Sequence, residues 1–204
     1  MRAGVKMPDS SWALSLAVQS GPVASDDRTT ILAEFRAELN DIAGTHNAAL
    51  TGLRLYRESL MKHLADAPNP DANLLIGHGD PNEQGSLAYQ RWPIRSIPKL
   101  LADDGPVAER LGQQWVVLIF TQWEHNYRPR LAQALGSKPE EIQDAYMGDI
   151  RHLRNDILHH AGIATQANTG RCLSLCWFQA GDRIVITTNH VAEFMHHCGL
   201  TIRP

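Results

Sequence analysis

The chain has 204 residues and a mass of 22.7 kDa, which suits one domain with room for a substantial hydrophobic core. Hydrophobic residues make up 43% of the sequence and charged residues 20%, a composition that excludes an intrinsically disordered chain. The net charge of −3 argues against a broad electropositive surface for non-specific duplex binding. The longest apolar run, from Trp115 to Phe120, is too short to span a bilayer, so no membrane partner is expected.

The number of cysteines and the start of the chain bear on its location. Three cysteines, an odd and low number, favour a reducing compartment, and the cytoplasm is the expected location. The apolar part of residues 1–25 is too short for a signal peptide, so these residues are expected to form a flexible arm. Residues 26–204 are predicted to form a single mainly α domain, a bundle of about four to six helices with one small C-terminal β-hairpin.

The first half of the chain contains one long helical pattern and one irregular region. Apolar residues recur at helical spacing over 26–64 and predict a helix, which Gly44 and Thr45 can break in two. Residues 66–106 are rich in proline and glycine. They are predicted to form a long connection with one short helix over 97–102.

The helical pattern returns in the middle of the chain. A helix is predicted over 107–127, where Pro129 should end or kink it, and a short helix follows over 130–135. The residues from Ser137 to Glu140 match a capping box. This box predicts the start of a helix over 139–161.

Glycines and strand-like alternation organise the C-terminal part. Gly162 is expected to stop the helix that precedes it. A β-hairpin is predicted over 172–188, because apolar alternation flanks a turn signal at 179–182. A last helix, capped by Thr188 or Asn189, should run through Cys198 to Gly199.

The predicted helix over 139–161 contains the most informative side chains. At about 100° per residue, its apolar and polar residues fall on opposite arcs, but Arg154 lies within the apolar arc. An unpaired buried charge is very costly, so Arg154 must pair with a carboxylate or face a cleft or interface. The alternative is that the polar arc is an ordinary solvated face and that Arg154 forms a structural ion pair.

Arg154, Asn155 and His159 form the pattern Arg-Asn-x-x-x-His close to a helix end. This pattern resembles the Arg-x4-6-His signature of the HEPN superfamily, whose members have it near the end of a long helix in an α-helical bundle. The resemblance covers roughly residues 107–162. It implies a metal-independent endoribonuclease that needs no cofactor, acts on RNA, and forms a homodimer in which two copies of the motif face one composite cleft.

The resemblance also implies roles for the motif residues. His159 is expected to act as general acid or base and Arg154 to clamp the phosphate, while Asn155 orients them by hydrogen bonding. Attack by the RNA 2′-hydroxyl would leave a 2′,3′-cyclic phosphate and a 5′-hydroxyl. A toxin or defence effector with a cognate antitoxin or regulatory protein is the expected context. Ala161, however, stands where HEPN toxins paired with a nucleotidyltransferase antitoxin often have a modifiable tyrosine.

Two other functions stay open at this point. The first is a non-catalytic HEPN-fold module that binds RNA, a nucleotide or a partner protein. The second is a structural helical domain in which the motif occurs by accident. Loss of toxicity on changing Arg154 or His159 would separate the nuclease from both.

Further charged residues lie near the motif or at the end of the preceding helix. Arg128 and Arg130 are expected to guide RNA phosphates, and Glu124 to pair with an arginine of the motif helix, although ordinary surface charge is the alternative. The residues assigned to substrate binding in this way are Arg151, Glu124, Arg128, Arg130 and His160.

Histidines and cysteines raise the question of a metal. Residues 159–160 and 196–198 contain candidate zinc ligands, but adjacent histidines on a helix diverge, so no metal site is expected. Cys172 and Cys176 would lie roughly 13 Å apart on a strand, too far for a disulfide.

Overall fold

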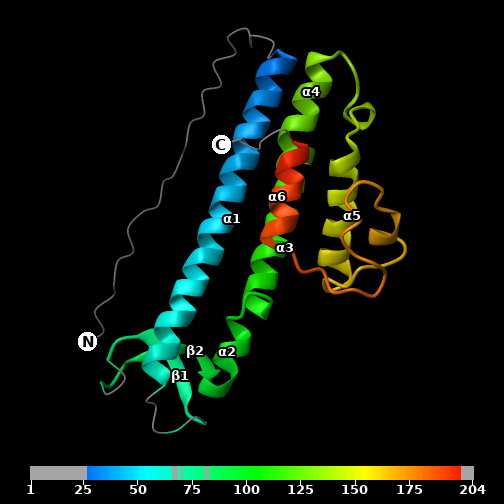
Figure 1. The fold of residues 1–204 in the computed structure, drawn as a ribbon. Helices are drawn as coiled ribbons and strands as arrows, with labels where there is room; N and C mark the ends of the chain where they lie inside the picture. The colour runs from blue at the N-terminus through cyan, green and yellow to red at the C-terminus, as the bar shows by residue number, and fades with distance from the viewer. Residues whose placement is uncertain (1–26, 66–68, 70, 81–82, 199–204) are drawn as a thin grey trace, which may run out of the picture.

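The computed structural model describes residues 27–65, 69, 71–80 and 83–198, and the arm expected at 1–25 lies outside them. The fold is mainly α, as predicted. The principal helices are α1 (Arg28–Leu64), α3 (Pro106–Gln122), α5 (Ala145–His159) and α6 (Thr188–His197). Helix α3 packs against both α1 and α5, and α6 contacts α1 (Figure 1). Within the described part of the chain, no helix is long and apolar enough to cross a membrane.

Helix α1 runs without interruption for 37 residues, so the break considered at Gly44 does not occur. The Asp27 side chain caps its start by accepting a hydrogen bond from the backbone N–H of Thr29 at 2.6 Å. Ile42, Ala43 and His46 are buried on either side of Gly44. Their packing holds this glycine in the helix despite its low intrinsic helix propensity.

The prediction of a C-terminal hairpin is wrong, because the strands lie in the middle of the chain. β1 (Asn73–His78) and β2 (Leu87–Pro93) pair antiparallel within the region predicted to be a connection. Around 172–188 the described chain forms an irregular loop, with one isolated bridge between Ile163 and Arg183. The backbone N–H groups of the expected first strand bind a side chain of α5, as described below, instead of a neighbouring strand.

The mid-chain hairpin follows from an alternation of half-buried and exposed residues, which the many prolines and glycines of this region hid in the sequence. Leu74 faces Trp92 across the ladder, and both are half-buried, whereas Leu75 is exposed. Gly79 and Gly85 adopt positive φ angles of 89° and 109° in the turn. The chain then enters η1 (Ile94–Ser96) and α2 (Ile97–Leu100), which confirms the short helix predicted there.

Pro129 neither ends nor breaks the helical path. A π-helical turn, η2 (Trp123–Tyr127), links α3 to α4 (Arg128–Ala134), so the chain stays helical through this region (Figure 1). Pro129 follows the π-helical turn directly, at the start of α4, and has no N–H to continue the hydrogen-bond ladder in which the Arg128 N–H bonds to the carbonyl of Trp123.

Helix α5 begins later than predicted. The capping-box region forms only a short 3-10 turn, η3 (Pro139–Glu141), and Asp144 is the N-cap, accepting from the Met147 N–H at 2.9 Å. Gly162, at φ 73°, follows the helix end as expected. Helix α6 is capped by Thr187, one residue before the predicted cap.

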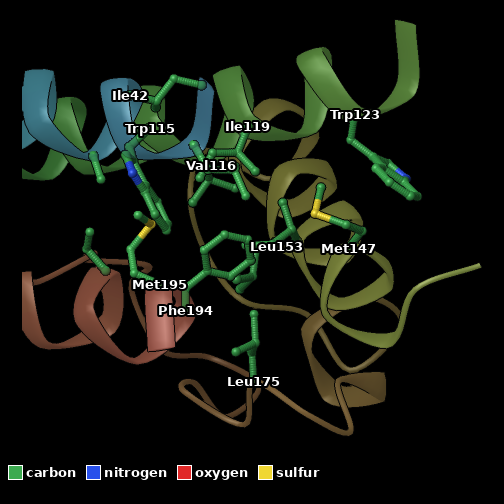
Figure 2. Packing of buried hydrophobic residues seen from close by; sticks show 14 of the residues in the cluster. Ile42, Trp115, Val116, Ile119, Trp123, Met147, Leu153, Leu175, Phe194 and Met195 are labelled. Carbon is green, nitrogen blue, oxygen red and sulfur yellow. The ribbon is translucent and has the colours of Figure 1, made fainter. Parts of the chain in front are cut away.

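The core joins all four principal helices and the C-terminal loop. Trp115 of α3 meets Phe194 of α6 edge-on, with ring centroids 5.5 Å apart. Leu175, from the loop, is fully buried and points into the same cluster as Leu153 of α5 (Figure 2). The loop is therefore part of the core despite its irregular backbone.

The buried His46 makes stability depend on pH. Burial lowers its pKa below the ordinary 6.5, although the backbone of Leu111 partly opposes this effect. The unfolded chain takes up a proton near pH 6.5 and the folded chain does so only at lower pH, so stability is lost as the pH falls below 6.5. We expect the urea midpoint to drop between about pH 7.5 and 5.5, and to drop less in His46→Gln. His63→Gln, at an exposed site on α1, should keep the full drop; an identical pH response in all three proteins would contradict this role of His46.

Candidate functional site

Arg154 is half-buried on α5 and lies against α3. Its guanidinium carbon is 5.9 Å from the centre of the Phe120 ring, and its Nη1 donates a hydrogen bond to Asn155 Oδ1 at 3.2 Å. Among the described residues, no carboxylate forms an ion pair with it. The guanidinium is therefore oriented by an amide and a ring, and its charge is not neutralised by a carboxylate in this part of the chain.

His159 is the last residue of α5, and its side chain is exposed. His160 is the C-cap. Helical geometry places Arg151, Asn155 and His159 along one exposed to half-buried stripe, which we call the α5 stripe. Arg154 and His159 point about 140° apart around the helix. Within one chain, the motif thus presents a cation and an imidazole in different directions.

A groove of about 810 Å³ lies between the start of α5 on one side and η2 and the start of α4 on the other. Glu124, Arg128 and Arg151 line it, so the structure brings three predicted site residues together. Phe120 also lines the groove and connects it to Arg154. Glu140 and Asp144 add negative charge to the same walls, which makes the groove a poor binding site for a polyanion.

The charged residues of η2 and α4 mainly join structural elements. Glu124 pairs with Arg128 at 2.8 Å, not with an arginine of α5 as expected. Arg128 Nε also donates to the carbonyl of Ile142 at 3.1 Å, which holds the loop before α5. Arg130 pairs with Glu34 of α1 at 2.7 Å. Arg128 thus links the η2–α4 path to the loop before α5, and Arg130 links α4 to α1.

Asp156, which helical periodicity places on the polar arc, is fully buried on α5 and organises the following loop. Its carboxylate accepts hydrogen bonds from the backbone N–H groups of Thr165 and Thr169, from both their hydroxyls, and from the Asn168 amide, at 2.6–3.2 Å. Burial alone would raise its pKa, but these hydrogen bonds together outweigh burial and lower the pKa to about 2. The side chain is therefore a charged anchor at neutral pH.

Asp149, two helical turns earlier on α5, also anchors this loop through its carboxylate. Its carboxylate accepts hydrogen bonds from the backbone N–H groups of Leu173, Ser174 and Leu175 at 2.7–3.2 Å. The signal in the sequence was the seven-residue spacing of Asp149 and Asp156, which places both on the same side of α5. That side was expected to face solvent, and it faces the loop.

The cysteines and histidines give no candidate metal centre. Among the described residues, no group of three or more His, Cys, Asp or Glu side chains is placed to hold a metal ion. Cys172 and Cys176 do not lie on a strand, so the expected 13 Å separation does not apply; Cys176 Sγ donates to the carbonyl oxygen of Cys172 at 3.5 Å. Burial raises the pKa of the Cys172 thiol to about 12, with a smaller contribution from Asp149, which makes it a poor nucleophile.

No protein-family model, curated protein or solved structure matches this chain. The α5 stripe and Arg154 together form the group of side chains in the described part of the chain whose chemistry points most directly to a function.

Proposed function

We propose that the protein is a metal-independent endoribonuclease of HEPN type that acts on cellular RNA as a toxin or defence effector. The observation that carries the proposal is the environment of Arg154. It is half-buried, oriented by Asn155 and Phe120, and has no carboxylate partner among the described residues. Such an arginine is suited to a phosphate, which it can bind through two parallel hydrogen bonds.

The chemistry of the motif fits cleavage by the RNA itself. The 2′-hydroxyl attacks the adjacent phosphorus, the bond to the 5′-oxygen breaks, and a 2′,3′-cyclic phosphate and a 5′-hydroxyl result. His159 moves a proton to or from these oxygens near neutral pH, and Arg154 stabilises charge on the phosphoryl oxygens.

A second copy of the chain completes the proposed site. Arg154 and His159 diverge within one chain, so a homodimer through the α5 stripe would bring Arg154 of one copy towards His159 of the other. Gly148 lies on the same exposed side, and a Cβ built on it meets nothing within 4 Å. This open space would let a partner helix approach closely.

Incubation of the protein with a mixed RNA substrate in EDTA tests the proposal. We expect cleavage that yields 2′,3′-cyclic phosphate ends, and a dimer by light scattering. A strictly monomeric protein that cleaves none of the RNA would contradict the proposal. RNA that is bound but left intact would instead favour the second candidate, a non-catalytic HEPN-fold module that binds RNA.

Asn155→Ala is expected to lower the cleavage rate about fivefold to tenfold. The substitution removes the hydrogen bond that orients Arg154, worth about 1 kcal/mol. The initial rate in EDTA measures the effect, and Asn40→Ala, at an exposed site on α1, is the matched control. Equal rates for Asn155→Ala and the wild type would show that Arg154 needs no orientation by this amide.

A further inference from the structure

The loop after α5 brings two cysteines close together. Cys176 Sγ lies 3.5 Å from the carbonyl oxygen of Cys172, to which it donates a hydrogen bond. In an extended strand the two Cα atoms would be roughly 13 Å apart, too far for a disulfide. The irregular path of the loop removes that obstacle, so a bond between the two sulfur atoms depends on the geometry of the loop and of the two side chains.

The curvature of the loop at this point comes from Asp149. One oxygen of its carboxylate, Oδ2, accepts hydrogen bonds from three consecutive backbone N–H groups, those of residues 173–175, at 2.7–3.1 Å. Three consecutive nitrogens can reach one atom only where the chain curls around it, as in an anion-binding nest. Cys172 and Cys176 flank these three residues, so the curl turns the two cysteines towards each other.

The hydrogen bond limits how far apart the two sulfur atoms can lie. A carbonyl oxygen is about 2.4 Å from the Cα atom of its own residue, so Cys176 Sγ is at most about 6 Å from Cys172 Cα. Cys172 Sγ stays about 2.8 Å from the same Cα atom and changes direction when χ1 rotates. Its present contact, with the carbonyl oxygen of Asp149 at 3.8 Å, is a weak hydrogen bond that costs little to lose. Rotation of the two side chains, with a small movement of the loop, can therefore bring the sulfur atoms to bonding distance.

The two thiols differ in exposure and in reactivity. Cys176 is exposed, so a dissolved oxidant reaches its sulfur directly. Cys172 is half-buried, and burial raises the pKa of its thiol to about 12. Because the thiolate is the form that reacts with an oxidant, Cys176 is the sulfur that is oxidised first. Cys172 is the partner that is held beside it, and its attack on the oxidised sulfur is the slow step at neutral pH.

We propose that Cys172 and Cys176 form a redox modification site, at which hydrogen peroxide closes a reversible disulfide. The Cys176 thiolate attacks one peroxide oxygen, the O–O bond breaks, and Cys176 becomes a sulfenic acid while hydroxide leaves and takes up a proton. The Cys172 thiol then loses its proton to solvent and attacks the Cys176 sulfur, from which a second hydroxide leaves and is protonated. In total the two thiols lose two electrons and two protons, and one peroxide is reduced to two molecules of water.

Treatment of the full chain with hydrogen peroxide, followed by mass spectrometry and thiol titration, tests the proposal. The reduced protein has three free thiols, and we expect the oxidised protein to have one, that of Cys198. The loss of two hydrogen atoms should be found in the tryptic peptide of residues 172–183, which contains both cysteines. Dithiothreitol should restore all three thiols, and circular dichroism should show the same helical content before and after oxidation.

Three serine variants make the test specific. Cys172→Ser and Cys176→Ser should both lose the disulfide. Cys198→Ser is the matched control and should keep it, because Cys198 lies at the far end of α6 and lines a separate hollow. In Cys172→Ser the sulfenic acid at Cys176 has no thiol beside it, so dimedone should trap it in at least about tenfold greater yield than in the wild type.

Three results would overturn the proposal. They are oxidation of Cys176 without a disulfide in the 172–183 peptide, a disulfide that includes Cys198, and a bond that links two chains through Cys176. Trapping of the first sulfenic acid at Cys172 would also overturn it, because the proposed order of the two steps would then be wrong. None of these measurements uses RNA, so their failure leaves the nuclease proposal untouched.

Discussion

His159→Ala is expected to lower the rate of RNA cleavage at least about 100-fold if the proposed nuclease activity is present. Loss of a general acid or base typically lowers the rate of the chemical step by roughly 10²–10⁴-fold. His159 is exposed at the end of α5 and its side chain forms no hydrogen bond with a described residue, so its truncation should leave the fold intact. Single-turnover cleavage in EDTA is the measurement, with His78→Ala on β1 as the matched control.

Mixing two inactive variants tests whether the site is composite. In a dimer of His159→Ala with Arg154→Ala, one of the two sites would combine an intact Arg154 with an intact His159. Random exchange makes half of the dimers mixed, so about a quarter of the wild-type activity should return. Full activity of His159→Ala alone would refute its role. Absence of any recovery in the mixture would refute the arrangement across two chains.

Asp156→Ala is expected to destabilise the protein by about 3–4 kcal/mol. It would leave one buried and one part-buried backbone N–H group and three side-chain donors of the following loop without their acceptor, and such losses belong to the largest effects of single substitutions. Urea unfolding gives the measurement. Asp182→Ala, in the same loop, removes an exposed carboxylate with one hydrogen bond and should cost under about 1 kcal/mol.

The same carboxylate predicts how the protein responds to acid. Its pKa is about 2 when folded and 3.8 in the reference state, so it contributes roughly 2.5 kcal/mol at neutral pH. Because the folded pKa is the lower one, this contribution is present above about pH 5 and is lost as the pH falls towards 2. Asp156→Asn should flatten the acid limb of the stability curve. A limb as steep as in the wild type would contradict the assignment.

Helical periodicity was enough to predict the bundle. The apolar spacing in α1 and α3 and the glycine after α5 are local signals, and the structure follows them. The prediction of a C-terminal hairpin was wrong for a non-local reason. The Asp149 carboxylate accepts hydrogen bonds from the backbone N–H groups that would have bonded to a neighbouring strand. Spacing along the sequence cannot show that competition.

The candidate site was predictable only in part. Helical periodicity placed Arg154 within the apolar arc, and the structure gives it Phe120 and Asn155 as neighbours. Glu124 and Arg128 are four residues apart, and they pair with each other because the helical path continues through η2 and places both side chains on one side of it. The sequence also could not reveal that Asp156 faces inward, since burial of a carboxylate depends on the loop that wraps it.

The way in which Asp149 holds the loop also affects which loop positions can accept substitutions during evolution. Asp149 holds its segment through main-chain N–H groups, which every residue except proline supplies. Leu173, 89% exposed, and Ser174 can therefore be replaced without loss of the anchor, whereas the buried Leu175 is constrained by the core. Positions 173 and 174 thus resemble a recognition loop on a fixed framework, in which new side chains can be tried at little cost to stability.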